Sequence, residues 1–382
     1  MARKIRMGMV GGGRGAFIGG VHRIAAAIDG EIELVCGAFS STPEKSKASG
    51  EDFMLDPSRC YGDFKEMIQK EKRRKDRIDV VSIVTPNHMH FAPAKMALEN
   101  GFHVICDKPV TFSLPEAKKL KEMIASTGLT FALTHNYTGY AMVKEARQLI
   151  KNGVLGTIRK VIVEYPQGWL SFPIEKEGAK QAEWRTDPKR SGIAGAVGDI
   201  GTHAENLAEY ITGLKITELC ADVNRVVEGR VLDDDANVLL HFDNGANGIL
   251  HCSQICNGDW NGLNIRVYGE LGTLQWHQEK PQYLHHKTTD EYQIYQPSVG
   301  KLSDSANAHT RIPFGHPEGY LEAFANVYRN FARTVRKRMN GEEPNEFDLD
   351  FPTIDDGIRG MQFVETVIAS GKSNSKWVKF KN

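Results

Sequence analysis

The chain contains 382 residues, with 48 lysines and arginines against 48 aspartates and glutamates, so its formal net charge is zero. This balance argues against a nucleic-acid partner, because proteins that bind polyanions usually carry a basic excess. Hydrophobic residues make up 41% of the sequence, which excludes a disordered chain, and the length predicts about two to three domains.

The first third of the chain alternates predicted strands and helices. A short apolar strand at 5–10 is followed by a glycine-rich turn and a helix that runs to residue 28. Further strands are expected at 33–39, 79–84, 101–106 and 130–133, with helices at 44–49, 63–72, 90–100 and 114–126. The third strand is apolar on both faces, which is typical of a parallel sheet covered by helices. This order predicts a doubly wound Rossmann α/β domain over residues 1–135.

After residue 135 the pattern changes. A helix at 140–152 leads into a strand at 157–165 and then into a loop at 166–197 that is rich in glycine, proline and charge. A helix is expected at 199–213, followed by alternating strands at 218–227, 236–242, 248–255 and 263–268, and by helices at 317–339 and 355–370. Turns such as 243–245 favour hairpins. Residues 136–382 are therefore predicted to form an α+β domain with a largely antiparallel sheet.

The glycine-rich turn fits the pattern G-x-G-x-x-A directly after the first strand. Gly11 would allow the tight turn, Gly13 would let the backbone approach a pyrophosphate, and Ala16 would let helix and strand pack closely. Because the turn opens the first helix of a βαβ unit, we predict a dinucleotide site. Its expected contacts are Gly11, Gly13, Arg14, Gly15 and Ala16.

The end of the second strand should hold the ribose of the cofactor. It reads Ala38-Phe39-Ser40-Ser41-Thr42 and carries neither an acidic residue nor an arginine. The hydroxyls of Ser40 and Ser41 could hold a ribose, or could join Lys45 in holding a 2′-phosphate. The pattern favours NAD, because a phosphate site usually carries an arginine, and NADP is not excluded.

A lysine stands at the end of the fourth strand, in Asp107-Lys108-Pro109. Ligands bind at the carboxyl edge of a doubly wound sheet, and Pro109 keeps Lys108 out of the helical region. A lysine that is partly desolvated beside a cationic nicotinamide can exchange protons near neutral pH. A solvated loop lysine is the alternative interpretation.

The preceding strand ends in a similar way, in Thr85-Pro86-Asn87, with His88 and His90 after it. No cysteine or acidic residue near this histidine pair completes a zinc ligand set, so no metal site is predicted.

Asp199 and His203 are four residues apart at the start of a predicted helix, which would place them on one face. Gly201 between them would leave room for a ligand. An acid and an imidazole on such a face suit the deprotonation of a hydroxyl during hydride loss. The alternative is an aspartate that favours the helix N-terminus and a packed histidine.

Taken together, these motifs resemble the Gfo/Idh/MocA family of oxidoreductases over essentially the whole chain. The resemblance rests on the glycine turn, Thr85-Pro86-Asn87-x-x-His90, Asp107-Lys108-Pro109, Trp184-Arg185-x-Asp187-Pro188 and Asp199-x-x-x-His203. The family's usual Glu-Lys-Pro is Asp-Lys-Pro here. The resemblance implies hydride transfer between a nicotinamide and a ring carbon that bears a secondary hydroxyl, in a sugar, glycoside or cyclitol.

The resemblance also implies roles for individual residues. Lys108 and His203 would exchange the substrate proton, and Asp199 would orient the substrate or the lysine. The cofactor would contact Thr85, Pro86, Asn87, His90, Asp107, Lys108, Pro109 and Asn136, and the substrate pocket would include Asn136, Tyr137, Trp184 and Arg185. The second domain would be an open sheet that commonly buries its face in a homodimer or homotetramer.

Two alternative functions use the same scaffold. In a redox-neutral glycosidase, oxidation at C3 of a sugar would acidify the C2 proton, the C1 substituent would leave, water would add and the hydride would return. In a non-catalytic nucleotide sensor, the proton-transfer residues would be lost, whereas Lys108, Asp199 and His203 are all present.

The charge of the substrate is left open. Arg185, Lys189, Arg190 and Arg311 gather in two loops, either as solvated charge or as a site for an anionic sugar such as a sulfoquinovoside. His316 precedes Pro317, which fits the first turn of a helix, so it would lie at a positive helix end. Arg311 and His316 are therefore further candidates for binding substrate.

The sequence contains no apolar run of about 20 residues and no signal-peptide pattern. Its six cysteines lack the spacing of a redox or zinc motif. We expect a reduced, cytoplasmic protein without a membrane partner.

Overall fold

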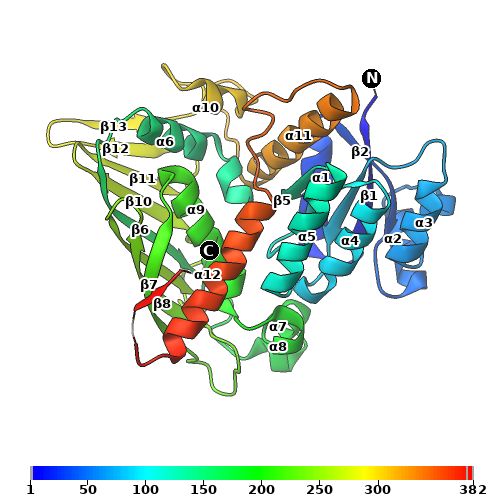
Figure 1. Cartoon of the computed structure of the whole chain (residues 1–382), viewed down its shortest axis with the longest axis horizontal. Coiled ribbons are helices and arrows are strands. Elements are labelled where there is room, and N and C mark those ends of the chain that lie inside the picture. Colours follow the sequence, from blue (N-terminus) through cyan, green and yellow to red (C-terminus); the bar gives the residue numbers. More distant parts are fainter. Residues whose placement is uncertain (1–2, 376, 381–382) are drawn as a thin grey trace. The chain divides into compact units, whose positions relative to one another are not determined.

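The computed structural model describes residues 3–375 and 377–380 and divides into two compact units (Figure 1). Unit 1 comprises Met1–Gly139 and Tyr320–Ile358, and unit 2 comprises Tyr140–Gly319 and Arg359–Asn382. The split expected from the sequence assigned everything after residue 135 to the second domain. In the structure, residues 136–139 and 320–358 belong to unit 1.

Unit 1 is built on a parallel five-stranded sheet in the order β2-β1-β3-β4-β5. The strands are β1 (Ile5–Gly11), β2 (Ile32–Ala38), β3 (Val80–Val84), β4 (His103–Cys106) and β5 (Phe131–Leu133). The prediction of a doubly wound sheet is confirmed. Strand order reverses at β1, which lies between β2 and β3, and ligands bind such sheets beyond the carboxyl ends of the strands at this point.

The helices of unit 1 begin and end close to the predicted residues. They are α1 (Phe17–Ile28), α2 (Pro43–Asp52), α3 (Phe64–Lys72), α4 (Phe91–Glu99), α5 (Leu114–Thr127) and α11 (Tyr320–Met339), with 3₁₀ turns at Pro57–Arg59, Asn87–Met89 and Asn136–Gly139. α3 carries a clear start signal, because the Asp63 side chain accepts hydrogen bonds from the backbone of Lys65 and Glu66.

Helix α11 completes the core of unit 1. It packs against α1, and Phe324, Tyr328 and Phe331 are buried with Met7 and Val80 of the sheet. The strands are apolar on both faces, so a sheet of this kind needs helices on each side. Fully burying one such aromatic side chain contributes about 1.5–3 kcal/mol, and α11 supplies three.

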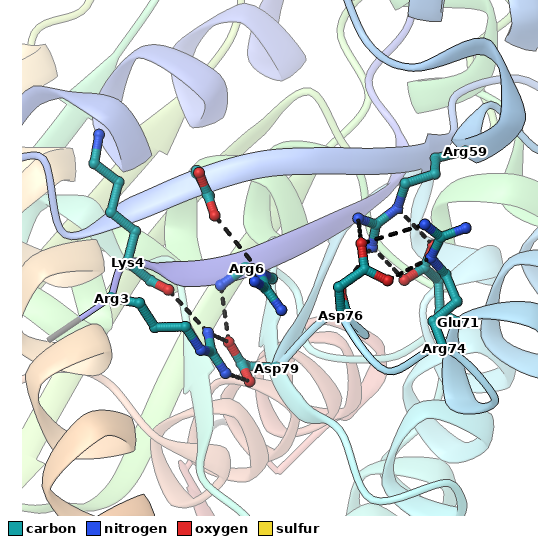
Figure 2. A network of polar contacts seen from close by, with 9 residues as sticks. Arg3, Lys4, Arg6, Arg59, Glu71, Arg74, Asp76 and Asp79 are labelled. Atoms are coloured by element: carbon teal, nitrogen blue, oxygen red, sulfur yellow. Dashed lines mark hydrogen bonds and ion pairs between the residues drawn. The ribbon is translucent and has the colours of Figure 1, made fainter. Parts of the chain in front are cut away.

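Unit 1 contains two clusters of ion pairs, which Figure 2 shows. In one, buried Glu71 of α3 lies 2.5 Å from the Arg59 guanidinium and accepts a hydrogen bond from the hydroxyl of Tyr61. In the other, Arg3 pairs with Asp79 at 2.6 Å. Asp79 precedes β3, at the amino end of the strands and away from the edge that binds ligands, so this cluster has a structural role.

Unit 2 is built on a mixed sheet, and its described residues give the strand order β13-β12-β11-β10-β6-β9-β8-β7-β14. The pair β6–β9 is parallel and all other pairs are antiparallel, so the prediction of a largely antiparallel sheet is confirmed. The strands are β6 (Ile158–Pro166), β7 (Ile216–Asn224), β8 (Asp235–Phe242), β9 (Asn247–Ser253), β10 (Asn264–Gly269), β11 (Thr273–His277), β12 (Leu284–Lys287), β13 (Tyr292–Tyr295) and β14 (Trp377–Lys379).

Helix α9 (Thr202–Thr212) packs on β6 and β9 and also against α6 (Ala141–Lys151). The predicted loop 166–197 contains two short helices, α7 (Lys180–Arg185) and α8 (Pro188–Ser191), after a 3₁₀ turn at Ile174–Glu177. The remaining helices are α10 (Asp304–Ala308) and α12 (Ile354–Lys372). None of the helices in the described ranges combines the length and the hydropathy that crossing a membrane would require.

Candidate active site

The glycine turn after β1 adopts the tight bend that the sequence predicts. Gly11 has a φ of 81°, and a Cβ there would lie 2.4 Å from the carbonyl oxygen of Val84. Gly12 also has a positive φ, of 70°. Only glycine takes up such a conformation in so little space, so the turn is fixed against the end of β3.

Gly13 and Gly19 each lie very close to another part of the backbone. A Cβ on Gly13 would lie 2.7 Å from the Phe39 carbonyl oxygen, so this glycine lets the turn approach the end of β2. Ala16 precedes α1 as its N-cap, and the close contact between helix and turn is made by Gly19. A Cβ on Gly19 would lie 2.3 Å from the Gly12 oxygen.

The start of α1 fits an anionic group. No side chain caps its first turn, which carries no acidic residue, so its backbone N–H groups and the helix dipole favour a phosphate. A Cβ on Gly15 would meet nothing within 4 Å. Arg14 is exposed, and its guanidinium binds the Asp52 carboxylate through two nitrogens. The glycine turn would therefore bind a pyrophosphate mainly through backbone N–H donors, because the positive charge of Arg14 is already paired.

The segment after β2 carries Ser40, Ser41 and Lys45, the residues predicted to lie near the ribose. Ser40 accepts a hydrogen bond from the backbone of Thr42 at 3.3 Å, and Ser41 and Lys45 are exposed. Their contacts with a ribose stay predictions.

Asp107 is held firmly at the end of β4. One of its carboxylate oxygens accepts hydrogen bonds from the Lys108 backbone at 2.9 Å and from the Thr134 hydroxyl at 2.8 Å. Burial alone would raise the pKa of Asp107, but the His22 imidazole and the positive charge of Lys108 hold it below its usual range. The carboxylate is therefore ionised, and its short side chain orients the backbone of the lysine.

His90 links two of the loops that follow the strands of unit 1. Its side chain is fully buried, Nδ1 lies 2.7 Å from the Pro109 oxygen, and Nε2 lies 2.7 Å from the Thr85 oxygen. Each ring nitrogen thus lies beside a backbone carbonyl oxygen, and the contact of His90 with the cofactor stays a prediction. His90 joins the loop after β3 to the loop after β4, and the neighbouring Asn87 is also buried.

One titratable residue near Lys108 was missed. His135 follows β5 and is 2% exposed, and burial, with the positive charge of Lys108, lowers its pKa to about 3. It is a neutral imidazole at physiological pH. The sequence could have revealed His135 by its position, because it follows a predicted strand just as Thr85 and Asp107 do. Asn136 and Tyr137 follow it in a buried 3₁₀ turn.

In unit 2, the Asp199 segment departs from the expected helix. Residues Val197–Gly201 form a π-helical turn, and α9 begins only at Thr202. The four-residue spacing of Asp199 and His203 therefore does not have α-helical geometry, and single π turns occur frequently at functional sites. Gly201 was expected to leave room for a ligand, but a Cβ there would lie 3.1 Å from the Cys252 Sγ. This glycine lets the turn pack against β9.

The Asp199 carboxylate is oriented by two side chains. Its Oδ2 accepts hydrogen bonds from Arg185 Nε at 3.0 Å and from Gln254 Nε2 at 2.9 Å. The Arg185 guanidinium also lies 4.2 Å from the centre of the Trp184 ring. Gln254, which the sequence did not single out, thus belongs to this group. A small cavity beside it is bordered by Leu170, Arg185, Thr186, Gly195, Arg230, Leu232, Asp233, Asp234 and Gln254.

The loop at 310–319 is held by an acidic residue. Glu318 accepts a hydrogen bond from the Arg311 backbone and lies 3.4 Å from the Arg311 guanidinium. Because α11 begins at Tyr320, Pro317 lies outside the helix, and the exposed His316 does not lie at its first turn. This corrects the expected place of His316. Arg185 and Arg311 are both paired with carboxylates, which weakens the case for an anionic site.

Each unit thus gathers its own set of groups. Unit 1 places the glycine turn, Thr85–Asn87, Asp107–Lys108 and His135–Asn136 at the carboxyl ends of four adjacent strands. Unit 2 places Arg185 against Asp199, with buried His203 one turn further along the chain, its ring 6.3 Å from that of Tyr165. Within the described ranges, no group of three or more His, Cys, Asp or Glu side chains could hold a metal ion.

Comparison with known proteins identifies a family for both parts of the chain. Residues 5–135 match the family model of an oxidoreductase family with an NAD-binding Rossmann fold, and residues 143–275 match the Gfo/Idh/MocA C-terminal domain. The protein is therefore an oxidoreductase with an NAD-binding domain.

Individual relatives extend over the whole chain. An uncharacterised oxidoreductase, YfiI of Bacillus subtilis, is 35% identical and covers 100% of this chain and 98% of its own. An inositol dehydrogenase homolog from Azotobacter vinelandii, solved with NAD⁺, is 35% identical with a TM-score of 0.95, covering 100% of this chain and 98% of that one. Its complex with NADH and myo-inositol aligns with a TM-score of 0.92 at 34% identity, with the same coverage. The chain belongs to the Gfo/Idh/MocA family.

Proposed function

We propose that this protein oxidises a secondary hydroxyl on the ring of an uncharged cyclitol or sugar and transfers the hydride to NAD⁺. The observation that carries the proposal is the pairing of Arg185 with Asp199, which precedes buried His203 by four residues. The pairing orients an acid near an imidazole and neutralises the arginine. The relative from Azotobacter vinelandii that was solved with myo-inositol supports a ring polyol as the substrate.

Proton transfer is assigned to Lys108 and His203. The nicotinamide, when bound, accepts the hydride, and the protein must remove the hydroxyl proton as the carbonyl forms. We assign this proton transfer to Lys108 and His203 and the orientation of the hydroxyl to Asp199, as the family resemblance implies. Asp107 holds the lysine backbone, and neutral His135 adds no positive charge beside it.

The residues of unit 1 are assigned to the cofactor. The uncapped start of α1 receives the pyrophosphate, and Ser40 and Ser41 receive the ribose. Thr85, Pro86 and Asn87 line the nicotinamide side, with Asn136. We assign Tyr137 and Trp184 to the substrate and the open sheet of unit 2 to a homodimer or homotetramer, which light scattering during size-exclusion chromatography would detect.

An uncharged substrate follows from the ion pairs in unit 2. A guanidinium that already binds a carboxylate offers an anionic sugar little net charge, and the two arginines that the sequence proposes for the substrate, Arg185 and Arg311, are both in this state. Sugar and cyclitol hydroxyls are instead recognised by hydrogen bonds from amide, imidazole and carboxylate groups, which Gln254, His203 and Asp199 supply.

The proposal is tested on the purified protein. Native mass spectrometry identifies the bound cofactor, and a panel of cyclitols, neutral sugars, anionic sugars and aryl glycosides is then screened for NADH and for released aglycone. We expect NADH with a neutral ring polyol and no aglycone. Aglycone without net NADH would establish the redox-neutral glycosidase instead. A preference for sulfonated or carboxylated sugars would contradict an uncharged substrate.

Variants separate proton transfer from binding. Lys108→Ala should lower kcat by about 10²–10⁴-fold, the usual contribution of a general base, while NADH still binds. Lys95→Ala is the matched control and should keep full activity, because Lys95 is a partly exposed lysine that pairs with Glu99 on α4. If Lys108→Ala kept full activity on every substrate, the assignment of the lysine would be wrong.

A further inference from the structure

A chain of buried polar side chains runs through unit 1 and ends at Asp107. The Ser82 hydroxyl on β3 lies 2.9 Å from the Tyr328 hydroxyl on α11, which lies 2.7 Å from His22 Nδ1 on α1. His22 Nε2 in turn lies 3.9 Å from Asp107 Oδ1. His22, Ser82 and Tyr328 are at most 1% exposed, and the mechanism proposed above uses none of them.

The hydrogens along this chain have one favourable arrangement. If His22 Nδ1 carried the hydrogen, the bare lone pair of Nε2 would face the Asp107 carboxylate and be repelled by it. If Nε2 carries the hydrogen, the Tyr328 hydroxyl donates to Nδ1 and the Ser82 hydroxyl donates to the Tyr328 oxygen. Every donor then points toward the carboxylate, and the tautomer of His22 is set by the hydrogen bond on its other nitrogen.

The surroundings of His22 give its second nitrogen nothing else to bind. Nε2 is buried and has no hydrogen-bond partner among the described residues, and the ring packs edge-on against Phe324 with 4.7 Å between centres. A buried polar group without a partner is costly, so its retention at a site needs an explanation. The nearest acceptor, Asp107, already orients the backbone of Lys108.

We propose that His22 is a positioning residue that holds the Asp107 carboxylate, and through it Lys108, with Ser82 and Tyr328 fixing its tautomer. The lowered pKa of Asp107 agrees, because the effect of burial is outweighed by His22 and by the positive charge of Lys108. The structural coupling is independent of the reaction, whereas its effect on turnover rests on the proposed function.

A double-mutant cycle on the full chain without substrate tests the coupling. His22→Phe keeps the ring but removes the nitrogens, and Asp107→Asn removes the charge. In urea unfolding, we expect the effect of His22→Phe on the unfolding equilibrium constant to differ at least fivefold between the wild-type and Asp107→Asn backgrounds. The matched control cycle uses Asp79→Asn, a buried carboxylate at the opposite end of the strands, and should give less than a twofold difference. Equal coupling in both cycles would overturn the proposal.

Conservative variants separate positioning from packing. His22→Gln keeps an N–H donor. The coupling of position 22 with Asp107 in the His22→Gln variant should therefore stay within twofold of the coupling between His22 and Asp107. Tyr328→Phe keeps the core packing but frees the tautomer, so it should lower the coupling. In turnover, His22→Phe should lower kcat at least tenfold with little change in KM or in NADH affinity. If His22→Phe and His22→Gln behave alike, His22 serves only as packing. Coupling without any effect on kcat would support the contact and count against the proposed role of Lys108.

Discussion

Buried His135 makes the protein sensitive to mild acid. Its pKa is about 3 in the folded chain, against an ordinary value near 6.5. Between these two values the unfolded chain binds a proton that the folded chain excludes. The free energy of unfolding therefore falls as the pH falls below about 6.5 and stops falling only near the folded pKa.

The size of this effect follows from the two pKa values. Between pH 7 and pH 5, one such histidine lowers the free energy of unfolding by about 2 kcal/mol. His103, which burial holds at a pKa of about 4, contributes in the same direction. Since folded domains are stable by only about 5–15 kcal/mol, the loss should be easy to measure.

Urea unfolding at pH 7 and at pH 5 tests the reasoning, with wild type beside His135→Asn. The variant should lose about 2 kcal/mol less than wild type between the two pH values. His316→Asn, at an exposed loop position, is the control and should match wild type. If His135→Asn kept the full pH dependence, His135 would not be the group that stays neutral in the fold.

Three further changes test the packing of the units by urea unfolding. Gly19→Ala should cost about 1–3 kcal/mol and weaken NADH binding, because its Cβ would lie 2.3 Å from a backbone oxygen, whereas Gly20→Ala should stabilise the helix slightly; equal effects would contradict the close approach. Glu71→Gln should cost about 1–3 kcal/mol, because the buried Arg59 guanidinium loses its closer carboxylate and keeps only Asp76, at 3.3 Å, and a change below about 1 kcal/mol would show that water reaches the site. Asp233→Ala should cost about 2–6 kcal/mol, since its carboxylate accepts two buried backbone N–H groups before the π turn, and a neutral result would mean that both find other acceptors.

The sequence predicts those parts of the fold that depend on local pattern. Apolar strands in alternation with helices lead directly to the parallel sheet, and the glycine turn is specified by Gly11, whose conformation only glycine adopts readily. The strand ends that carry Lys108 and Asn87 are predictable for the same reason. Parallel strands bring their carboxyl ends to one edge, so polar residues after each strand share a neighbourhood.

The features that escaped prediction depend on distant contacts. Nothing local in the sequence of α11 shows that its apolar face belongs to a sheet some 200 residues earlier. The pairing of Arg185 with Asp199 and the burial of His90 between two carbonyl groups are likewise settled by tertiary packing. The sequence can indicate that Gly13, Gly19 and Gly201 lie at close approaches. Which backbone or side chain each of them approaches depends on the tertiary structure.

The place of α11 in unit 1 affects how the protein is made. The first 139 residues leave the ribosome with one face of their sheet lacking the three aromatic side chains that α11 will supply. At about 5–20 residues per second, roughly 10–40 s pass before residue 339 is synthesised. The nucleotide-binding half is thus finished after most of unit 2 has emerged, and a fragment truncated at residue 139 should be aggregation-prone when expressed alone.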